Sequence, residues 1–192
     1  LPTSNISPAA LFRALEKWGP TLLIDEADTF AKDNEELRGL LNSGHTRKTA
    51  FVVRTVGDDF EPTPFSTWGC KALAGIGNLP ETIMSRSIIA IMRRKTAGER
   101  VDSLRRAGSE VFEGVTRRLA RWATDNGVTF EKHRPAIDEL TNRTADNWEP
   151  LYSLADIAGG GWPGWARAAA RKLAGIENDA PSLNEELLHD IN

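Results

Sequence analysis

The sequence predicts an α/β protein in which a parallel-sheet core fragment is followed by a C-terminal helical lid. The run Thr21–Ile24 is apolar without alternation, which is typical of a strand covered on both faces in a parallel sheet. Helical and strand patterns alternate up to about residue 95, and only helical patterns follow. We therefore expect a partial α/β core at residues 1–95, a helical lid at 96–175, and an acidic tail with a short helix at 176–192.

The composition excludes several classes of protein. With 40% hydrophobic residues the chain can form a globular core, and its net charge of -3 gives no overall signal for nucleic acid. The single cysteine, Cys70, excludes an internal disulfide and fits a reducing compartment. No stretch approaches the roughly 20 apolar residues of a membrane span, so we expect a cytoplasmic protein with no membrane partner.

The charge is unevenly distributed along the chain. Residues 93–175 carry 15 basic and 11 acidic side chains, whereas residues 176–192 carry 5 acidic and no basic ones. The net charge of +4 (15 − 11) on the longer segment is a weak indication of an anionic partner such as DNA. A set of helices with solvated arginine faces is an equally good explanation.

The core elements follow from local signals. Ser7 and Pro8 open a helix that Gly19-Pro20 ends, because serine caps a helix and proline fits its first turn. Asp33 with Glu36 predicts a capping box for a second helix, which ends at residues 42–44. Residues 49–68 alternate β-rich segments with a central turn and predict a β-hairpin. Residues 71–76 and 87–92 predict two further strands buried in the sheet.

The predicted lid consists of helices alone. One clear apolar stripe at helical spacing is made by Val111, Val115, Leu119 and Trp122. Pro135 and Pro150 each predict the start of a helix, residues 159–161 predict a break, and residues 165–173 predict the last helix. In the tail, Ser182 and Glu185 predict a capping box before a short helix.

The strongest chemical signal is the pair of carboxylates that follows Thr21–Ile24. In open α/β sheets, ligands bind outside the carboxyl ends of strands. Asp25 at that position can hold Mg²⁺, directly or through water, beside the phosphates of a nucleotide. Glu26 can then orient or deprotonate an attacking water. An ordinary strand that runs into an acidic loop is the alternative.

Two further polar residues stand where such a site needs them. Asn78 follows the strand predicted at 71–76, so its amide can contact both a γ-phosphate and the attacking water. Arg86 precedes the strand predicted at 87–92 and can reach a nucleotide held by a neighbouring subunit. Taken singly, each residue is better explained as an ordinary turn or surface side chain.

Taken together, these parts resemble the AAA+ ATPases, and within them the viral and mobile-element helicases of superfamily three. Those P-loop NTPases carry an acidic Walker B pair followed by a helix, a β-hairpin, a strand tipped by asparagine, and an arginine finger. The resemblance assigns Asp25 and Glu26 to Walker B, Asn78 to sensor one and Arg86 to the finger. It implies ATP and Mg²⁺ as cofactors, and a homo-oligomeric ring in which the finger acts in trans.

Three longer segments resemble an uncharacterised family of bacterial and phage proteins, often joined to primase or helicase modules of mobile elements. These segments are Ser4–Arg13, Asn34–His45 and Phe65–Trp68. The resemblance covers roughly residues 1–175 and bears on fold more than on activity.

The phosphate loop of such enzymes, G-x-x-x-x-G-K-[ST], does not occur in the sequence. Gly69-Cys70-Lys71 lacks the first glycine and leads into a strand. Because the chain starts at Leu1, close to where the second core strand should end, we expect the loop to lie upstream. Natural loss of the loop is the rival explanation. In either case we expect this chain alone to bind ATP weakly and to hydrolyse it negligibly, because nothing cradles the phosphates.

Two other features have weaker functional interpretations. In the helicases the hairpin points into the pore of the ring, but the tip of this one carries Asp58 and Asp59, which disfavours contact with DNA phosphates. A hairpin that packs a subunit interface is the alternative. In the lid, Arg167 is the candidate second sensor that binds the γ-phosphate. It is equally well explained as a solvated arginine while Trp162 and Trp165 fill the core.

The sequence therefore predicts the C-terminal part of an ATP-hydrolysing motor that acts on DNA during replication of a phage or mobile element. One alternative is a non-catalytic interaction or regulatory module that keeps the ATPase fold. A further alternative is an AAA+ ATPase that remodels proteins, which stimulation by a protein rather than by DNA would distinguish.

Overall fold

The computed structural model describes residues 1–3, 6–31, 34–102, 104 and 108–176. It divides into two compact units, unit 1 at Leu1–Ser87 and unit 2 at Ile88–Asn192. The sequence analysis placed the corresponding boundary after residue 95. Each unit has its own hydrophobic cluster, so each is described separately.

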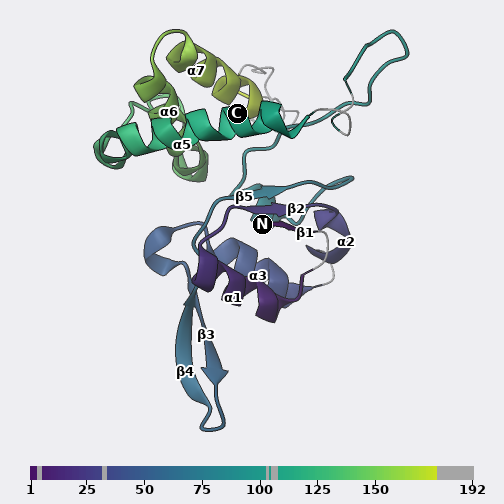
Figure 1. Ribbon diagram of the computed structural model, residues 1–192, viewed down its shortest axis with the longest axis vertical. Coiled ribbons are helices and arrows are strands. Elements are labelled where there is room, and N and C mark those ends of the chain that lie inside the picture. Colours follow the sequence, from purple (N-terminus) through teal and green to yellow (C-terminus); the bar gives the residue numbers. More distant parts are fainter. Residues whose placement is uncertain (4–5, 32–33, 103, 105–107, 177–192) are drawn as a thin grey trace, which may run out of the picture. The chain divides into compact units, whose positions relative to one another are not determined.

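Unit 1 contains a three-stranded parallel sheet, formed by β1 (Pro2–Thr3), β2 (Leu22–Ile24) and β5 (Lys71–Leu73) (Figure 1). The central strand is β2, which pairs in parallel with both neighbours. Pro2, Leu23 and Ala72 are aligned across the three strands. The prediction of a mixed α/β fold with a parallel sheet is therefore confirmed at this level.

The first helix, α1 (Pro8–Trp18), lies where the sequence predicted it. The hydroxyl of Ser7 accepts the amide N–H of Ala10 at 3.3 Å, and Pro8 occupies the first turn. Gly19 ends the helix in the left-handed region at φ 52°, where glycine avoids the steric cost that a Cβ would add.

Two helices follow β2. A short one, α2 (Ala27–Ala31), had no predicted counterpart. The next, α3 (Glu35–Ser43), was predicted, but its cap is Asn34, whose side chain accepts the N–H of Leu37 at 2.9 Å. Asp33, the predicted cap, lies outside the described residues.

The core of unit 1 lies on one face of the sheet. Its buried members come from α1, β2, α2, α3 and the short helix α4 (Glu81–Met84), and they are Leu11, Phe12, Leu15, Leu22, Ile24, Ala27, Leu37, Leu40, Leu41 and Ile83. On the opposite face Leu23 is 47% exposed, although it belongs to the central strand. The prediction that this strand is covered on both faces is wrong for the described residues, because the helices of unit 1 pack on one face alone.

The predicted hairpin is present, between β2 and β5 in the chain. After the 3-10 turn η1 (Arg47–Thr49), the strands β3 (Phe51–Val56) and β4 (Glu61–Ser66) pair antiparallel. The hairpin extends away from the sheet, and its base is held by the ring of Phe65, 4.8 Å from that of Phe12 (Figure 1).

The segment after β5 differs from its prediction. The strand is shorter than 71–76, and a short helix, α4 (Glu81–Met84), precedes Ser85. No strand forms at 87–92, which the sequence analysis had assigned to the sheet. Ile91 is 91% exposed, whereas Ile88 packs on the hydrophobic cluster of unit 2. A β-branched run remains irregular when no neighbouring strand pairs with it.

The described residues of unit 2 form the α-helices α5 (Ser109–Lys132), α6 (Asn142–Ala158) and α7 (Trp162–Leu173). Its cluster contains Leu140, Trp148, Tyr152 and Ala170, and Ile176 packs against it. Among the described residues, no helix combines the length and apolar composition that crossing a bilayer requires.

Three predictions about where the helices of unit 2 begin are wrong. Pro135 opens no helix, and Pro150 lies inside α6 rather than at its start. The buried Trp148 and Tyr152 flank this proline, so burial of α6 in the core offsets the loss of its N–H. α7 begins at Trp162 rather than at residue 165, because proline is tolerated within the first turn.

The large side chains of unit 2 are distributed differently from the predictions. Trp148 is buried, but Trp162 and Trp165 are 57% and 63% exposed and stack edge to face. Val115 and Leu119 of the apolar stripe are exposed as well. Within the described part of unit 2 the two tryptophans do not fill the core, so the explanation that placed them there is wrong.

Candidate functional site

Asp25 directly continues the central strand of the sheet. Its backbone N–H donates to the carbonyl oxygen of Thr3 at 3.0 Å, which holds it in line with β1. Its carboxylate Oδ1 accepts the backbone N–H of Glu26 at 2.9 Å. The residue is exposed at the carboxyl edge of the sheet.

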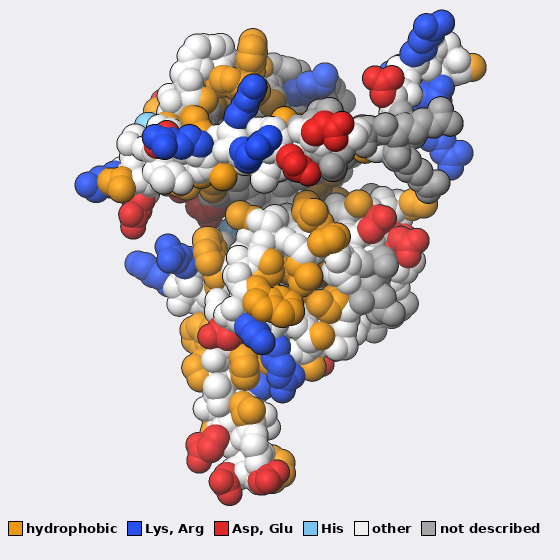
Figure 2. Space-filling model, in the orientation of Figure 1, with side chains coloured by type: hydrophobic (Ala, Val, Ile, Leu, Met, Phe, Trp, Pro, Cys, Tyr) orange, Lys and Arg blue, Asp and Glu red, His pale blue; other side chains and the backbone are white. Residues whose placement is uncertain are grey.

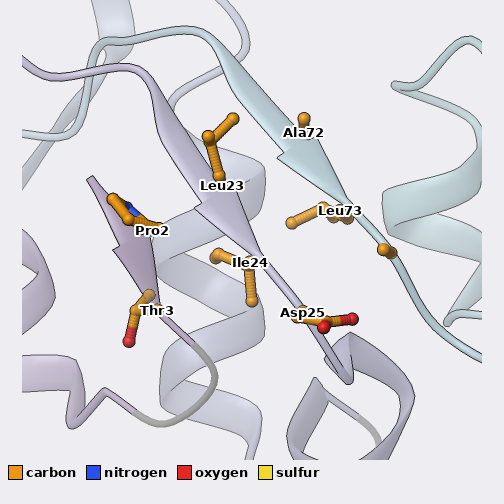
Figure 3. A pocket seen from close by; sticks show the side chains of 8 residues that line it. Pro2, Thr3, Leu23, Ile24, Asp25, Ala72 and Leu73 are labelled. Atoms are coloured by element: carbon orange, nitrogen blue, oxygen red, sulfur yellow. The ribbon is translucent and has the colours of Figure 1, made fainter. Parts of the chain in front are cut away.

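An open hollow of about 520 Å³ lies along the uncovered face of the sheet. It is lined by Pro2, Thr3, Leu23, Ile24, Asp25, Ala72, Leu73 and Ala74 (Figure 3). Asp25 is the one ionisable side chain in this lining, and it lies at the carboxyl end of an otherwise apolar floor. The hollow therefore combines an apolar surface with a single negative charge.

Glu26 has an unusual backbone conformation. Its φ of 55° lies in the left-handed region, which costs a residue with a Cβ of order 1–3 kcal/mol. The turn is held by Thr29, whose N–H and hydroxyl both donate to the carbonyl oxygen of Glu26, at 3.0 and 2.7 Å. The side chain is exposed next to Asp25. Such strain occurs often at functional sites, where it aims a side chain.

Asp28 joins the turn after β2 to the loop after β5. Its Oδ1 accepts the backbone N–H of Ile76 at 3.0 Å, and the N–H of Ala27 donates to the carbonyl oxygen of Ala74 at 2.8 Å. A Cβ on Gly75 would lie 2.6 Å from that Oδ1, so only glycine allows this approach. The sequence analysis assigned no role to Asp28. The signal available was an acid in the first turn of a helix together with a glycine after the neighbouring strand.

Asn78 lies in the loop that this contact holds. The loop follows β5, the parallel neighbour of β2, so it begins at the same edge of the sheet as Asp25 and Glu26. Its side chain is exposed. The structure therefore places Asp25 and Glu26 directly after β2, and Asn78 in the loop that follows the neighbouring strand.

Arg86 belongs to unit 1 but is held by its own helix. Its Nη1 donates to the carbonyl oxygen of Thr82 at 2.8 Å, at the end of α4. The hydroxyl of Thr82 in turn accepts the side-chain N–H of Asn42 at 3.1 Å, which ties α4 to α3. The contacts described for Arg86 thus lie within α4, and none joins it to Asp25 or Glu26.

Arg167 lies in unit 2, where it is paired with a carboxylate. Its Nη1 and Nη2 donate to the two oxygens of Asp156 at 2.9 and 3.4 Å, and its guanidinium stacks 4.9 Å from the ring of Tyr152. His133 Nε2 lies 3.2 Å from the same carboxylate. The hydrogen bond from Arg167 lowers the pKa of Asp156. These contacts join α6, α7 and the end of α5.

A second carboxylate is held in the same way. The hydroxyl of Tyr152 donates to Glu139 at 2.9 Å, and Arg171 donates to the other oxygen at 3.1 Å. The hydrogen bond from Tyr152 lowers the pKa of Glu139. Burial, and then this bond, raises the pKa of Tyr152 to about 12. The sequence analysis missed this network because its members are separated by up to 32 residues along the chain.

Lys71, in the segment that partly resembles a phosphate loop, has a structural role. Its Nζ donates to the carbonyl oxygens of Thr67 and Gly69 at 3.2 and 2.9 Å. Burial lowers the pKa of this ammonium group. A Cβ on Gly44 would lie 2.3 Å from Nζ, so the lysine is enclosed rather than presented to a phosphate.

The described residues hold no ready-made metal cage. Among them, no group of three or more His, Cys, Asp and Glu side chains lies close enough to bind an ion. A magnesium ion beside a nucleotide needs one or two carboxylates and takes its other ligands from phosphates and water. Asp25, an exposed carboxylate directly after the central strand, meets that requirement.

By its architecture the chain is an α/β unit with polar groups at the carboxyl edge of its sheet, followed by a unit that is helical in its described residues. It belongs to the family described as protein of unknown function (DUF3631), whose model matches residues 91–192. It is also similar to a protein of Saccharopolyspora erythraea described as an uncharacterized 28.9 kDa protein in the xis 5' region, with 40% identity over 102 residues. That match covers 52% of this chain and 38% of the relative, so the chain spans about two fifths of the relative's length. No solved structure matches.

Proposed function

We propose that this chain is the C-terminal part of an ATP-hydrolysing motor of the P-loop, AAA+-like kind that acts on DNA. The observation that carries the proposal is that Asp25 and Glu26 directly follow β2, while Asn78 lies in the loop after β5, the parallel neighbour of β2. Ligands of open α/β sheets bind outside the carboxyl ends of such strands. The motor belongs to a phage or mobile element in this proposal, and the chain alone is inactive.

The geometry gives each residue a distinct role. Asp25 would hold Mg²⁺, through water, with the carboxylate oxygen that does not accept the N–H of Glu26. Bound ATP and Mg²⁺ would supply the scissile phosphate and neutralise its charge. Glu26 is aimed by its strained turn and would orient and deprotonate the attacking water. Asn78 would contact the γ-phosphate from the loop that Asp28 holds.

Arg86 completes the proposed site only in an assembly. We assign it to the nucleotide of a neighbouring subunit, which requires the side chain to leave the carbonyl oxygen of Thr82. A homo-oligomeric ring of the complete protein follows from that role. Arg167 would have to leave Asp156 to act as a second sensor, so the unit 2 pair competes with this function.

DNA is proposed as the substrate on the basis of charge. Residues 93–175 have a net charge of +4 (15 − 11). The hairpin is a weaker candidate for the contact, because acidic side chains gather at its far end (Figure 2). Those acids are Asp58, Asp59 and Glu61, and they disfavour the approach of phosphates.

The first test extends the protein upstream of Leu1 to include a phosphate loop and measures ATP turnover with and without single-stranded DNA. We expect turnover that rises with DNA. Glu26→Gln should reduce turnover at least about 100-fold, as loss of a general base does, while leaving ATP binding intact. Glu61→Gln, at the hairpin tip, is the matched control and should keep full turnover.

Two results would contradict the motor. One is an absence of turnover in the extended protein although ATP binds. The other is equal turnover in the Glu26→Gln and Glu61→Gln proteins, which would show that the carboxylate next to Asp25 does no chemistry.

A specific observation favours a second candidate, the non-catalytic interaction module. Unit 2 exposes Trp162 and Trp165 as a pair and also exposes the apolar stripe of α5, and large exposed apolar groups mark interaction surfaces. Under this candidate, Trp162→Ala with Trp165→Ala would abolish binding of a partner protein and leave any ATP turnover unchanged. A DNA-stimulated turnover that needs Glu26 would exclude it.

A further inference from the structure

The β3–β4 hairpin has two outer edges, and its backbone hydrogen bonds show which groups point out of each. In an antiparallel pair of strands, residues whose N–H and C=O groups bond the partner strand alternate with residues whose groups point outward. The N–H of Thr67 donates to the carbonyl oxygen of Ala50 at 2.9 Å, directly before β3. Counted from that bond, the outward-pointing residues are Phe51, Val53 and Thr55 in β3, and Pro62, Pro64 and Ser66 in β4.

The outer edge of β4 is closed to another strand. Pro62 and Pro64 have no N–H to donate, and the N–H of Ser66 is taken by Oε2 of Glu16 in α1 at 2.6 Å. Prolines at outward-pointing positions keep a further strand from joining an edge. Strand addition to this hairpin can therefore occur on the β3 side alone.

The outer edge of β3 is open. Phe51 and Val53 are 52% and 51% exposed, and Thr55 is exposed as well. Within the described part of the chain, no backbone group of another element bonds the outward N–H groups of these residues. The carbonyl oxygen of Val53 accepts Nη1 of its neighbour Arg54 at 2.9 Å and keeps a second lone pair. Most of the hairpin extends beyond the other elements of unit 1, and a two-stranded hairpin alone is marginally stable in water (Figure 1).

We propose that β3 pairs antiparallel with β3 of a second copy of this chain, about a two-fold axis at Val53. The two hairpins then form one four-stranded sheet. In this register Val53 lies opposite its own copy and Phe51 lies opposite Thr55, so every outward group of β3 finds a partner. An aromatic side chain opposite a β-branched one is also a favourable cross-strand pair.

Other registers use fewer of these groups. When one strand slides by two residues, Thr55 comes opposite Thr49, which belongs to the 3-10 turn η1. A slide in the other direction brings Phe51 opposite Gly57 in the turn of the hairpin, and it also sets Arg54 directly against its own copy. Like charges directly opposite each other destabilise a sheet. The register centred on Val53 is therefore favoured.

The charges at the two ends of the hairpin favour a second copy as the occupant. The exposed turn at the base carries Arg47 and Lys48, whereas the tip carries Asp58 and Asp59 (Figure 2 shows the acidic tip). Antiparallel pairing about Val53 brings the basic base of each hairpin to the acidic tip of the other, and the symmetry repeats this contact. A parallel pair would set like charges together instead.

Pairing through β3 also limits the assembly to a dimer. Both outer strands of the four-stranded sheet are β4, whose Pro62 and Pro64 prevent further addition. The contact is isologous and closed. It uses no residue at the carboxyl edge of the parallel sheet, so the inference holds whether or not the motor function does.

A single engineered cysteine tests the register in the full chain. In a Cys70→Ser background, Val53→Cys should form a covalent dimer on mild oxidation, because the Cα atoms of opposed hydrogen-bonded residues lie about 5.5 Å apart, within the range of a disulfide. Thr55→Cys, on the same strand and face, is the matched control. Its two copies would lie about 13 Å apart along the strands and should remain unlinked. Equal cross-linking of both proteins would overturn the proposal, because it would show random encounters.

Sedimentation equilibrium measures the dimer without a cross-link. Val53→Pro removes an outward N–H from each copy and should weaken dimerisation about 10-fold or more. The strand itself should tolerate this change, because Pro64 occupies the opposed position in β4. Pro64→Val is the control and should not weaken the dimer, and far-UV circular dichroism checks that each variant is folded. A folded wild-type chain that stays monomeric, or a dimer that Val53→Pro leaves intact, would overturn the proposal.

A charge exchange tests the contact between base and tip. Lys48→Glu and Asp58→Lys each bring like charges together and should weaken the dimer several-fold, more so at low salt. The double variant restores opposite charges in both contacts and should recover the wild-type dissociation constant. If the double variant is as weak as the single ones, the antiparallel arrangement is wrong.

Amide hydrogen exchange identifies the occupant of the edge. We expect the N–H groups of Phe51, Val53 and Thr55 to be protected only at protein concentrations at which the dimer forms. Protection that does not depend on concentration would overturn the proposal and make another segment of the same chain the occupant. Rapid exchange at every concentration would overturn it as well and would leave the edge to a strand of a different protein.

Discussion

At the scale of single residues, the backbone of Glu26 links stability to function. A Cβ at φ 55° is strained, so the conformation persists because the turn to Thr29 and the strand before it impose it. Strain kept at a residue with an outward carboxylate indicates that the direction of that carboxylate matters. This interpretation can be tested through stability alone.

Glu26→Gly should be more stable than Glu26→Ala by about 1 kcal/mol, because both lose the carboxylate and only alanine keeps the strained Cβ. Urea denaturation measures the difference. The same pair of substitutions at Glu35, in the first turn of α3, is the control and should give the opposite order, since glycine weakens a helix. If the two Glu26 variants are equally stable, the backbone of residue 26 is not strained by its Cβ.

Gly75 should be intolerant of the smallest side chain. Gly75→Ala brings a Cβ within 2.6 Å of Asp28 Oδ1 and should break the bond to Ile76, at a cost of about 1–3 kcal/mol in unfolding free energy. Gly39→Ala, in the open middle of α3, should instead stabilise by about 0.5–1 kcal/mol. A neutral Gly75→Ala would show that the loop can move away from Asp28.

Tyr152 gives a direct optical readout of unit 2, because it is the single tyrosine of the chain. Its pKa is raised to about 12 in the fold from an ordinary 10.0. A group that holds its proton more tightly when folded contributes stability that is complete below pH 10 and is lost as the pH rises toward 12. Ultraviolet titration should therefore show a midpoint well above 10 in the native protein and near 10 in denaturant. A native midpoint near 10 would contradict the buried bond to Glu139.

At the scale of elements, the pair between Arg167 and Asp156 holds α6 and α7 together. Both side chains are less than a third exposed, so truncating either one leaves a poorly solvated partner. Arg167→Ala and Asp156→Asn should each destabilise, with a coupling of about 1–2 kcal/mol in a double-mutant cycle. A coupling near zero would free Arg167 for the sensor role. Arg134→Ala, on the exposed segment after α5, is the neutral control.

The elements also show what local patterns can and cannot predict. α1, β2, α3 and the hairpin were predicted, because a cap, an apolar run and turn chemistry each act within a few residues. The strand at 87–92 was wrong, because a strand exists only where another strand pairs with it. The helix start predicted at Pro150 was wrong for a similar reason. Burial of the neighbouring residues in the core outweighs the preference of proline for the first turn of a helix.

In the candidate site, too, the residues that follow from local patterns could be predicted, and those that depend on distant contacts could not. Asp25, Glu26 and the loop that carries Asn78 could be predicted to start from one edge, because parallel strands end together. Asp28 could not, because its partner is 48 residues away and a backbone N–H carries no mark in the sequence. The network around Glu139 is equally non-local. The exposure of Val115 and Leu119 could not be predicted, because a periodic stripe does not show whether another element covers it.

At the scale of the whole molecule, the two hydrophobic clusters predict two folding units. Differential scanning calorimetry should resolve two transitions, since each cluster is made within its own unit. Gly75→Ala should lower the midpoint of one transition alone, and Asp156→Asn that of the other alone. A single transition that both substitutions shift would show that the units fold as one.

The contact between Asp28 and the amide of Ile76 also has an evolutionary consequence. The carboxylate needs a glycine at position 75, and that glycine has no comparable need unless the carboxylate is there. Among related chains the two positions should therefore change together. A lineage that replaces the aspartate is released to accept a side chain at 75, whereas one that keeps it is not. If Asp28 and Gly75 vary together while Asp25 does not, the variant lineages have lost the contact that holds the loop and have kept the carboxylate of Asp25.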